Sequence, residues 1–127
     1  MEKIIQDVLL KEKISDKDYY VAILDGADCR SMRSFLKQIG NVFNFPPYYG
    51  QNINALNECL NDLEWLNKLN YILIVTASGK LLCDEPKETR DHMLAMLEDV
   101  SKEWDSVPNY DGEDVYRKRA DFRIRLL

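Results

Sequence analysis

The 127-residue chain contains one histidine, three cysteines and five glycines, and these small numbers exclude several kinds of site. One histidine with no recognisable nucleophile motif near it does not support Ser-His-Asp or Cys-His catalysis. Cys29, Cys59 and Cys83 lie outside the spacings that bind zinc or form redox pairs. Residues 77–80 (Ala-Ser-Gly-Lys) lack the glycine spacing of a phosphate-binding loop. We therefore expect no catalytic residues, no metal and no cofactor, and a protein that is not an enzyme.

The sequence also lacks a long hydrophobic run. The apolar run at residues 71–76 is far shorter than the roughly 20 residues that cross a bilayer. Charged and polar side chains interrupt residues 1–12, so these residues do not form the apolar core of a signal peptide. An odd number of widely spaced cysteines is typical of reduced thiols. We therefore expect a cytoplasmic protein with no membrane partner.

Positive charge is in the minority. The chain has 17 Lys and Arg residues against 22 Asp and Glu residues, which gives a net charge of −5. Because proteins bind the phosphate backbone chiefly through Lys and Arg, we expect no direct binding to nucleic acid. The basic residues within 117–125 are interleaved with carboxylates, and a solvated strand edge explains them more simply than a phosphate site does.

Hydrophobic residues make up 46% of the chain and charged residues 31%, which is typical of one folded domain. The hydrophobic patterns predict strands at residues 19–24, 71–76 and 120–126, and helices at residues 31–43, from residue 52 and from residue 86. Strands separated by helices favour parallel pairing. We predict an α/β fold in the order βααβαβ, with a small three-stranded parallel sheet and helices packed on it.

Residues 1–18 form an N-terminal extension ahead of a single domain at residues 19–127. The apolar residues of the extension recur at helical spacing, and they are Ile4, Ile5, Val8 and Leu9. This spacing predicts a short appended helix or arm.

The most informative segment covers residues 46–60, with the sequence Pro-Pro-Tyr-Tyr-Gly-Gln-Asn-Ile-Asn-Ala-Leu-Asn-Glu-Cys-Leu. Its prolines and glycine predict a turn, and a helix follows from Asn52. We expect Tyr49 to pack in the core and Tyr48 to face the solvent. A rigid, exposed aromatic side chain with a polar tip is a type enriched in protein–protein interfaces.

The helix that follows this turn is predicted to be amphipathic. Ile53, Leu56 and Leu60 recur at helical spacing and should face the core, so Glu58 should face the solvent. No Lys or Arg occurs at residues 38–67, whereas three carboxylates do. An aromatic and acidic surface without a local cation indicates a cationic partner.

Residues 46–60 resemble a segment of the barstar family of ribonuclease inhibitors. That family carries the pattern Pro-x-Tyr-Tyr-Gly-x-Asn-x-Asp-Ala-Leu-x-Asp-x-Leu, and this chain matches its Tyr-Tyr-Gly-x-Asn core and the spaced Ala-Leu. The resemblance extends over residues 19–127 and leaves residues 1–18 without a counterpart. It implies the same order of elements, and binding to a ribonuclease through the Tyr-Tyr-Gly loop and the outer face of the following helix.

The resemblance also implies which residues contact the partner. In this sequence they are Tyr48, Gly50, Asn52, Asn54, Asn57, Glu58 and Asn61, with a further carboxylate, Asp99, on the later long helix. Three positions depart from the family pattern. Asn54 replaces an acidic residue, Glu58 is one methylene longer than the family's aspartate, and Asn57 stands where an aromatic residue is often found.

These residues predict a protein inhibitor that is monomeric when free and forms a one-to-one complex with a cationic ribonuclease. Carboxylates of the inhibitor would stand where the phosphates of RNA bind. The departures at Asn54 and Asn57 keep a second hypothesis open. In that alternative, the chain is an immunity or adaptor protein of the same fold whose partner is not a ribonuclease.

Overall fold

The computed structural model describes residues 2–127, and its elements follow the order predicted from the sequence. The helices and strands are α1 (Glu2–Glu12), β1 (Tyr19–Asp25), α2 (Met32–Val42), α3 (Ile53–Leu60), β2 (Asn70–Thr76), α4 (Lys87–Asp105) and β3 (Phe122–Leu126). Short 3-10 helices include η2 (Glu64–Leu66) after α3, η3 (Ser78–Lys80) after β2 and η4 (Glu113–Val115) before β3.

The three strands form one parallel sheet with β2 in the centre. β1 and β3 both pair with β2 in parallel, so that Tyr20 lies opposite Tyr71 and Tyr71 lies opposite Phe122. The interior residues of β2 are all buried, because this strand has neighbours at both edges and helices over both faces. The structure therefore confirms the predicted α/β fold and its three-stranded parallel sheet.

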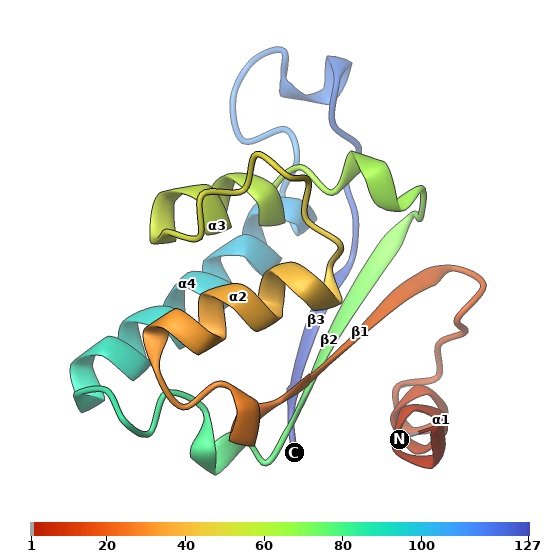
Figure 1. Ribbon diagram of the computed structural model, residues 1–127. Helices are drawn as coiled ribbons and strands as arrows, with labels where there is room; N and C mark the ends of the chain where they lie inside the picture. The colour runs from red at the N-terminus through yellow and green to blue at the C-terminus, as the bar shows by residue number, and fades with distance from the viewer. Residues whose placement is uncertain (1) are drawn as a thin grey trace.

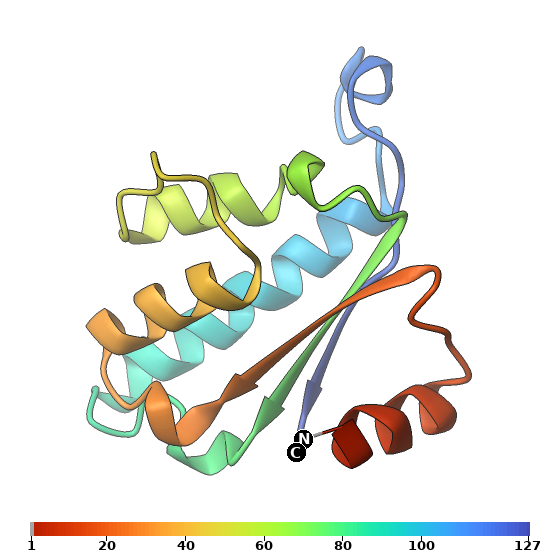
Figure 2. The ribbon, with the colours of Figure 1, turned by 45° about the vertical axis from the view of Figure 1, so that its right-hand side comes forward.

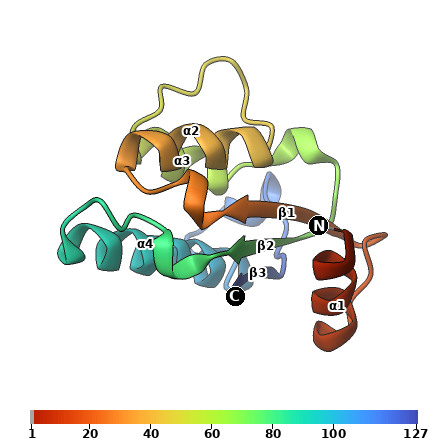
Figure 3. The ribbon, with the colours of Figure 1, turned by 60° about the horizontal axis from the view of Figure 1, so that its bottom comes forward.

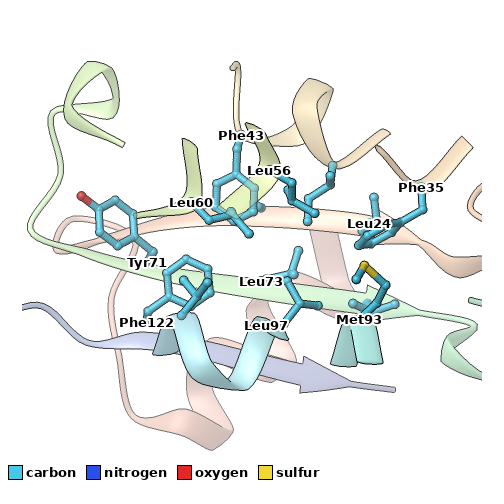
Figure 4. Packing of buried hydrophobic residues seen from close by; sticks show 14 of the residues in the cluster. Leu24, Phe35, Phe43, Leu56, Leu60, Tyr71, Leu73, Met93, Leu97 and Phe122 are labelled. Carbon is cyan, nitrogen blue, oxygen red and sulfur yellow. The ribbon is translucent and has the colours of Figure 1, made fainter. Parts of the chain in front are cut away.

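Helices α2, α3 and α4 cover one face of the sheet, and α1 lies on the other face (Figures 1, 2 and 3). The larger core fills the space between the sheet and the three helices. Figure 4 shows it as a meeting of side chains from α3 (Leu56 and Leu60), β2 (Leu73) and α4 (Leu97). Trp104 of α4 also donates a hydrogen bond from its indole nitrogen to the Leu60 carbonyl at 2.9 Å, which ties α4 to the end of α3.

The N-terminal helix α1 gives the sheet a second, smaller core. Val8 and Leu9 of α1 are buried, and Val8 packs with Ile72 and Ile74 on the sheet face that α2, α3 and α4 leave open. The spacing of apolar residues at 1–14 thus predicted α1 correctly. Because α1 covers Ile72 and Ile74, we infer that it stabilises the sheet and is more than a loose arm.

Two arginines of β3 anchor the end of α1. Glu12 accepts from Arg123 at 3.0 Å and from Arg125 at 2.5 Å. These contacts, led by the hydrogen bond from Arg125, lower the pKa of Glu12. The expectation that the basic residues at 117–125 form a solvated strand edge is therefore wrong for three of them. Arg123 and Arg125 join β3 to α1, and Arg117 pairs with the buried Glu113.

Residues 2–127 contain no helix that combines the length and the apolar character required to cross a bilayer.

Candidate functional site

The loop between α2 and α3 holds its two tyrosines in opposite orientations, as the sequence predicted. Tyr48 is 73% exposed, whereas Tyr49 is half-buried and packs edge-on against Phe45, with 4.7 Å between ring centroids. The Tyr49 hydroxyl donates to the Leu36 carbonyl of α2 at 2.8 Å. Burial raises the pKa of Tyr49 to about 12, so the hydroxyl stays protonated and keeps this bond. Tyr49 therefore fixes the loop that presents Tyr48.

A glycine in α2 makes room for the Tyr49 ring. A Cβ atom at Gly40 would lie 2.8 Å from Cε2 of Tyr49, which is closer than carbon atoms can approach. Glycine at position 40 therefore lowers the helix propensity of α2 but lets the Tyr49 ring pack closely against this helix.

We expect Gly40→Ala to lower the free energy of unfolding by about 1–3 kcal/mol, the usual cost of overpacking. Propensity alone predicts the opposite sign, because alanine is favoured over glycine inside a helix by about 0.5–1 kcal/mol. Urea denaturation monitored by circular dichroism measures the change. Gly79→Ala is the matched control, since a Cβ there meets nothing within 4 Å. A Gly40→Ala variant as stable as the parent would show that the Tyr49 ring does not need this space.

Asn52 and Gly50 set the start of α3. Asn52 is the N-cap, and its Oδ1 accepts from the Ala55 backbone N–H at 2.9 Å, which satisfies one of the free donors of the first turn. A Cβ atom at Gly50 would lie 3.0 Å from the side-chain nitrogen Nδ2 of Asn52. Asn52 thus caps α3, and the absence of a side chain at Gly50 leaves room for the Asn52 amide.

The outer face of α3 carries Asn54, Asn57 and Glu58, all exposed. Leu56, Cys59 and Leu60 occupy the inner face and are buried, so the helix holds the Glu58 carboxylate away from the core as predicted. The prediction that Ile53 faces the core is wrong, because its side chain is 43% exposed. Ile53 is the first residue of α3, and side chains point back toward the start of a helix. Its side chain therefore adds apolar surface beside the loop.

Two further carboxylates influence Tyr48. Desolvation raises the pKa of the Tyr48 hydroxyl, and the charges of Asp62, Cys59 and Glu64 raise it further. Asp62 and Glu64 therefore belong to the acidic surface, although the family pattern did not include them among the contact residues. Their place in the cation-free stretch of residues 38–67 was the signal that could have identified them.

Asn61, at the end of α3, differs from the other predicted contact residues. It is only half-buried, but its side chain is engaged within the protein. Its Nδ2 donates to the Asn57 carbonyl at 3.0 Å, and its Oδ1 accepts from Arg117 at 2.7 Å. Asn61 thus links α3 to the segment before β3.

Arg117 places a positive charge next to α3, although residues 38–67 contain no Lys or Arg. It is buried, stacks 3.9 Å from the ring centroid of Trp104, and pairs with the buried Glu113 at 3.0 Å. Hydrogen bonds to Glu113, first from the Asn109 backbone and then from the Asn109 and Arg117 side chains, lower the pKa of this carboxyl. The charge of Arg117 is therefore neutralised inside the protein, and the exposed face of α3 stays acidic.

Asp99 lies on a different helix from the other predicted contact residues. It is exposed on α4, and no hydrogen bond or ion pair within residues 2–127 connects it to the loop or to α3. The structure therefore groups Tyr48, Gly50, Asn52, Asn54, Asn57 and Glu58 on one surface, with Asn61 at its end. We refer to this group, together with Asp62 and Glu64, as the α3 surface.

The α3 surface combines an exposed aromatic side chain with exposed carboxylates. Nowhere in residues 2–127 do three His, Cys, Asp or Glu side chains gather as a metal site would require. Over residues 19–126, the chain matches the family described as Barstar (barnase inhibitor). The chain belongs to the barstar family. No match was found among curated proteins. The barstar-family region starts at β1, so α1 lies outside it.

Proposed function

We propose that the chain inhibits a basic ribonuclease by binding across its active site in a one-to-one complex. The loop at Tyr48–Gly50 and the outer face of α3 would make the contact. The observation that carries this proposal is the exposed Glu58 carboxylate on a capped helix, beside Asp62 and Glu64 and with the nearby Arg117 neutralised, in a chain of the barstar family. The family description names a ribonuclease inhibitor.

The physical basis is charge complementarity at a phosphate-binding site. A ribonuclease must hold phosphate groups, so its active site is lined with cationic side chains. A carboxylate on a fixed helix can occupy that site without the loss of conformational freedom that a flexible segment would suffer on binding. Tyr48 and Ile53 supply apolar contact area beside the charge. Such an inhibitor needs no catalytic group of its own.

The proposal is tested by measuring RNA hydrolysis by a panel of small basic ribonucleases that includes barnase. Rising amounts of the chain should abolish hydrolysis by at least one of them, with an end point at equal molar amounts. The chain alone should hydrolyse no RNA, and protein denatured by heat is the control for non-specific effects. Failure to inhibit every member of the panel at micromolar concentration would reject the proposal.

The association rate should fall as salt is added. The net charge of −5 and the carboxylates of the α3 surface would attract a cationic partner over a distance. The Debye length shrinks several-fold between about 50 mM and about 500 mM salt, so stopped-flow association should slow over this range. The dissociation rate should change less, because rim charges act mainly on association. An association rate that stays flat across the range contradicts electrostatic attraction.

Asn54 and Asn57 support a second candidate function. Both are exposed and uncharged, so Glu58 is the only carboxylate within α3 itself. A barstar-family chain with this surface could serve as an immunity or adaptor protein for a partner that is not a nuclease. Competition separates the two functions, because a mononucleotide that occupies a ribonuclease active site should block binding only if the partner is a ribonuclease.

A further inference from the structure

A groove opens where the α3 surface ends. It has a volume of about 910 Å³ and lies between residues 61–71 and residues 116–120. Asn61 and Asp62 belong both to the α3 surface and to the lining of this groove, so the two are continuous. Figures 1 and 2 show the segment before β3, drawn in blue, projecting past the C-terminal end of α3.

The projecting segment, residues 107–119, is fixed in place by buried polar contacts. Glu113 accepts from the Asn109 backbone at 2.6 Å and pairs with Arg117, which in turn reaches Asn61 and stacks on Trp104. The segment is therefore held in one position relative to α3 before any partner arrives. A surface organised in advance binds without the entropy loss of ordering a loop.

This fixed segment exposes apolar side chains that the fold does not use. Tyr110, Val115 and Tyr116 are each more than half exposed to solvent, and so is Leu69. Tyr116 and Leu69 both line the groove. Clustered exposed apolar groups of this kind mark interaction sites more often than single ones do, and tyrosine is enriched among the residues that dominate binding.

The groove also carries unused positive charge. Lys118 and Arg119 line one side, and Lys118 forms no hydrogen bond or ion pair within residues 2–127. These groups fit a carboxylate.

We propose that the groove receives a loop of the same ribonuclease that binds the α3 surface, and that this loop presents an apolar side chain to Tyr116 and Leu69 and a carboxylate to Lys118. This inference rests on the proposed function. The cationic active site would face Glu58, and a single carboxylate of the nuclease beside that site would face Lys118. A carboxylate that meets Lys118 beside the cationic active site would fix the orientation of the partner and disfavour nucleases that lack it.

A second copy of the chain fits the groove less well than a cationic nuclease does. Each chain carries a net charge of −5, so two copies repel each other. Asp62 and Glu64 also line the groove, so they favour a partner that is cationic overall and carries its carboxylate opposite Lys118.

The test combines Tyr116→Ala with Lys118→Glu and measures binding to the ribonuclease that the chain inhibits most strongly. Neither side chain makes a hydrogen bond within residues 2–127, so the double variant should unfold at the same temperature as the parent. Its dissociation constant should rise at least about tenfold, because an exposed aromatic anchor and a charge pair are both lost. Lys80→Glu is the matched control, since it makes the same charge change in η3, at the end of β2 away from the groove, and should leave affinity within about twofold.

The outcomes separate this inference from the proposed function. If Glu58→Ala weakens binding and the double variant binds like the parent, the groove assignment is wrong and the inhibitor function stands. If the parent binds no ribonuclease of the panel, both fail. Sedimentation that detects a dimer of the parent, dissociated by the double variant, would assign the groove to self-association and overturn the proposal.

Discussion

Glu58→Ala should raise the dissociation constant of the complex at least about thirtyfold and leave the fold intact. Truncating one partner of a desolvated charge pair typically costs about 2–5 kcal/mol, a range for which the barnase–barstar pair is itself a reference case. Each 1.4 kcal/mol corresponds to about a factor of ten, so the lower limit of this range gives about thirtyfold. Glu58 is exposed on the outer face of α3 and touches none of the core. The free energy of unfolding should therefore change by no more than about 0.5 kcal/mol.

Leu56→Ala provides the opposite control on the same helix. Leu56 is fully buried in the larger core, so its truncation should cost about 2–5 kcal/mol of stability. At a temperature where both variants are folded, isothermal calorimetry should show a large loss of affinity only for Glu58→Ala. A Glu58→Ala variant that binds as tightly as the parent would show that α3 is not the inhibitory helix.

Removal of residues 1–18 should lower the free energy of unfolding by about 3–5 kcal/mol. Burial of a Val or Leu side chain contributes about 1.5–3 kcal/mol, and the deletion removes both of the buried α1 residues, Val8 and Leu9. It also uncovers Ile72 and Ile74 of the sheet, so the truncated chain should associate with itself as its concentration rises. Urea denaturation and light scattering measure the two effects.

A neighbouring pair of leucines in α1 gives a milder version of this experiment. Leu9 is 5% exposed and Leu10 is 75% exposed. Leu9→Ala should destabilise the protein clearly, whereas Leu10→Ala should stay within about 0.5 kcal/mol of the parent. If the deletion and Leu9→Ala both leave the unfolding midpoint unchanged, α1 does not contribute to the stability of the sheet.

The sequence predicted those features that depend on local periodicity. The apolar run of β2 and the opposite orientations of Tyr48 and Tyr49 were both expected, and the structure confirms them. Each of these follows from the spacing or chemistry of residues close together in the chain. The placement of Glu58 on the solvent side of α3 could be predicted for the same reason.

The features that the sequence did not predict depend on contacts between distant residues. Ile53 was expected in the core because it fits the helical spacing of Leu56 and Leu60. That spacing does not show whether the neighbouring elements extend far enough to cover the Ile53 side chain. The bond between Asn61 and Arg117 joins residues on opposite sides of α4 in the chain, and no local pattern encodes it. The anchoring of α1 through Glu12 likewise requires Arg123 and Arg125 at the other end of the sequence.

The position of β3 in the chain has a consequence for protein synthesis. β3 is the last element in sequence, yet it completes the sheet on which α4 packs, and Arg117 just before it holds the end of α3 through Asn61. During translation, residues 48–61 leave the ribosome well before these supports exist. Long-range pairing of this kind forms late, because a long loop must close first. We therefore expect a nascent chain whose β3 is still inside the ribosome to present an incompletely supported α3 surface, so that the inhibition proposed above begins only after β3 has emerged.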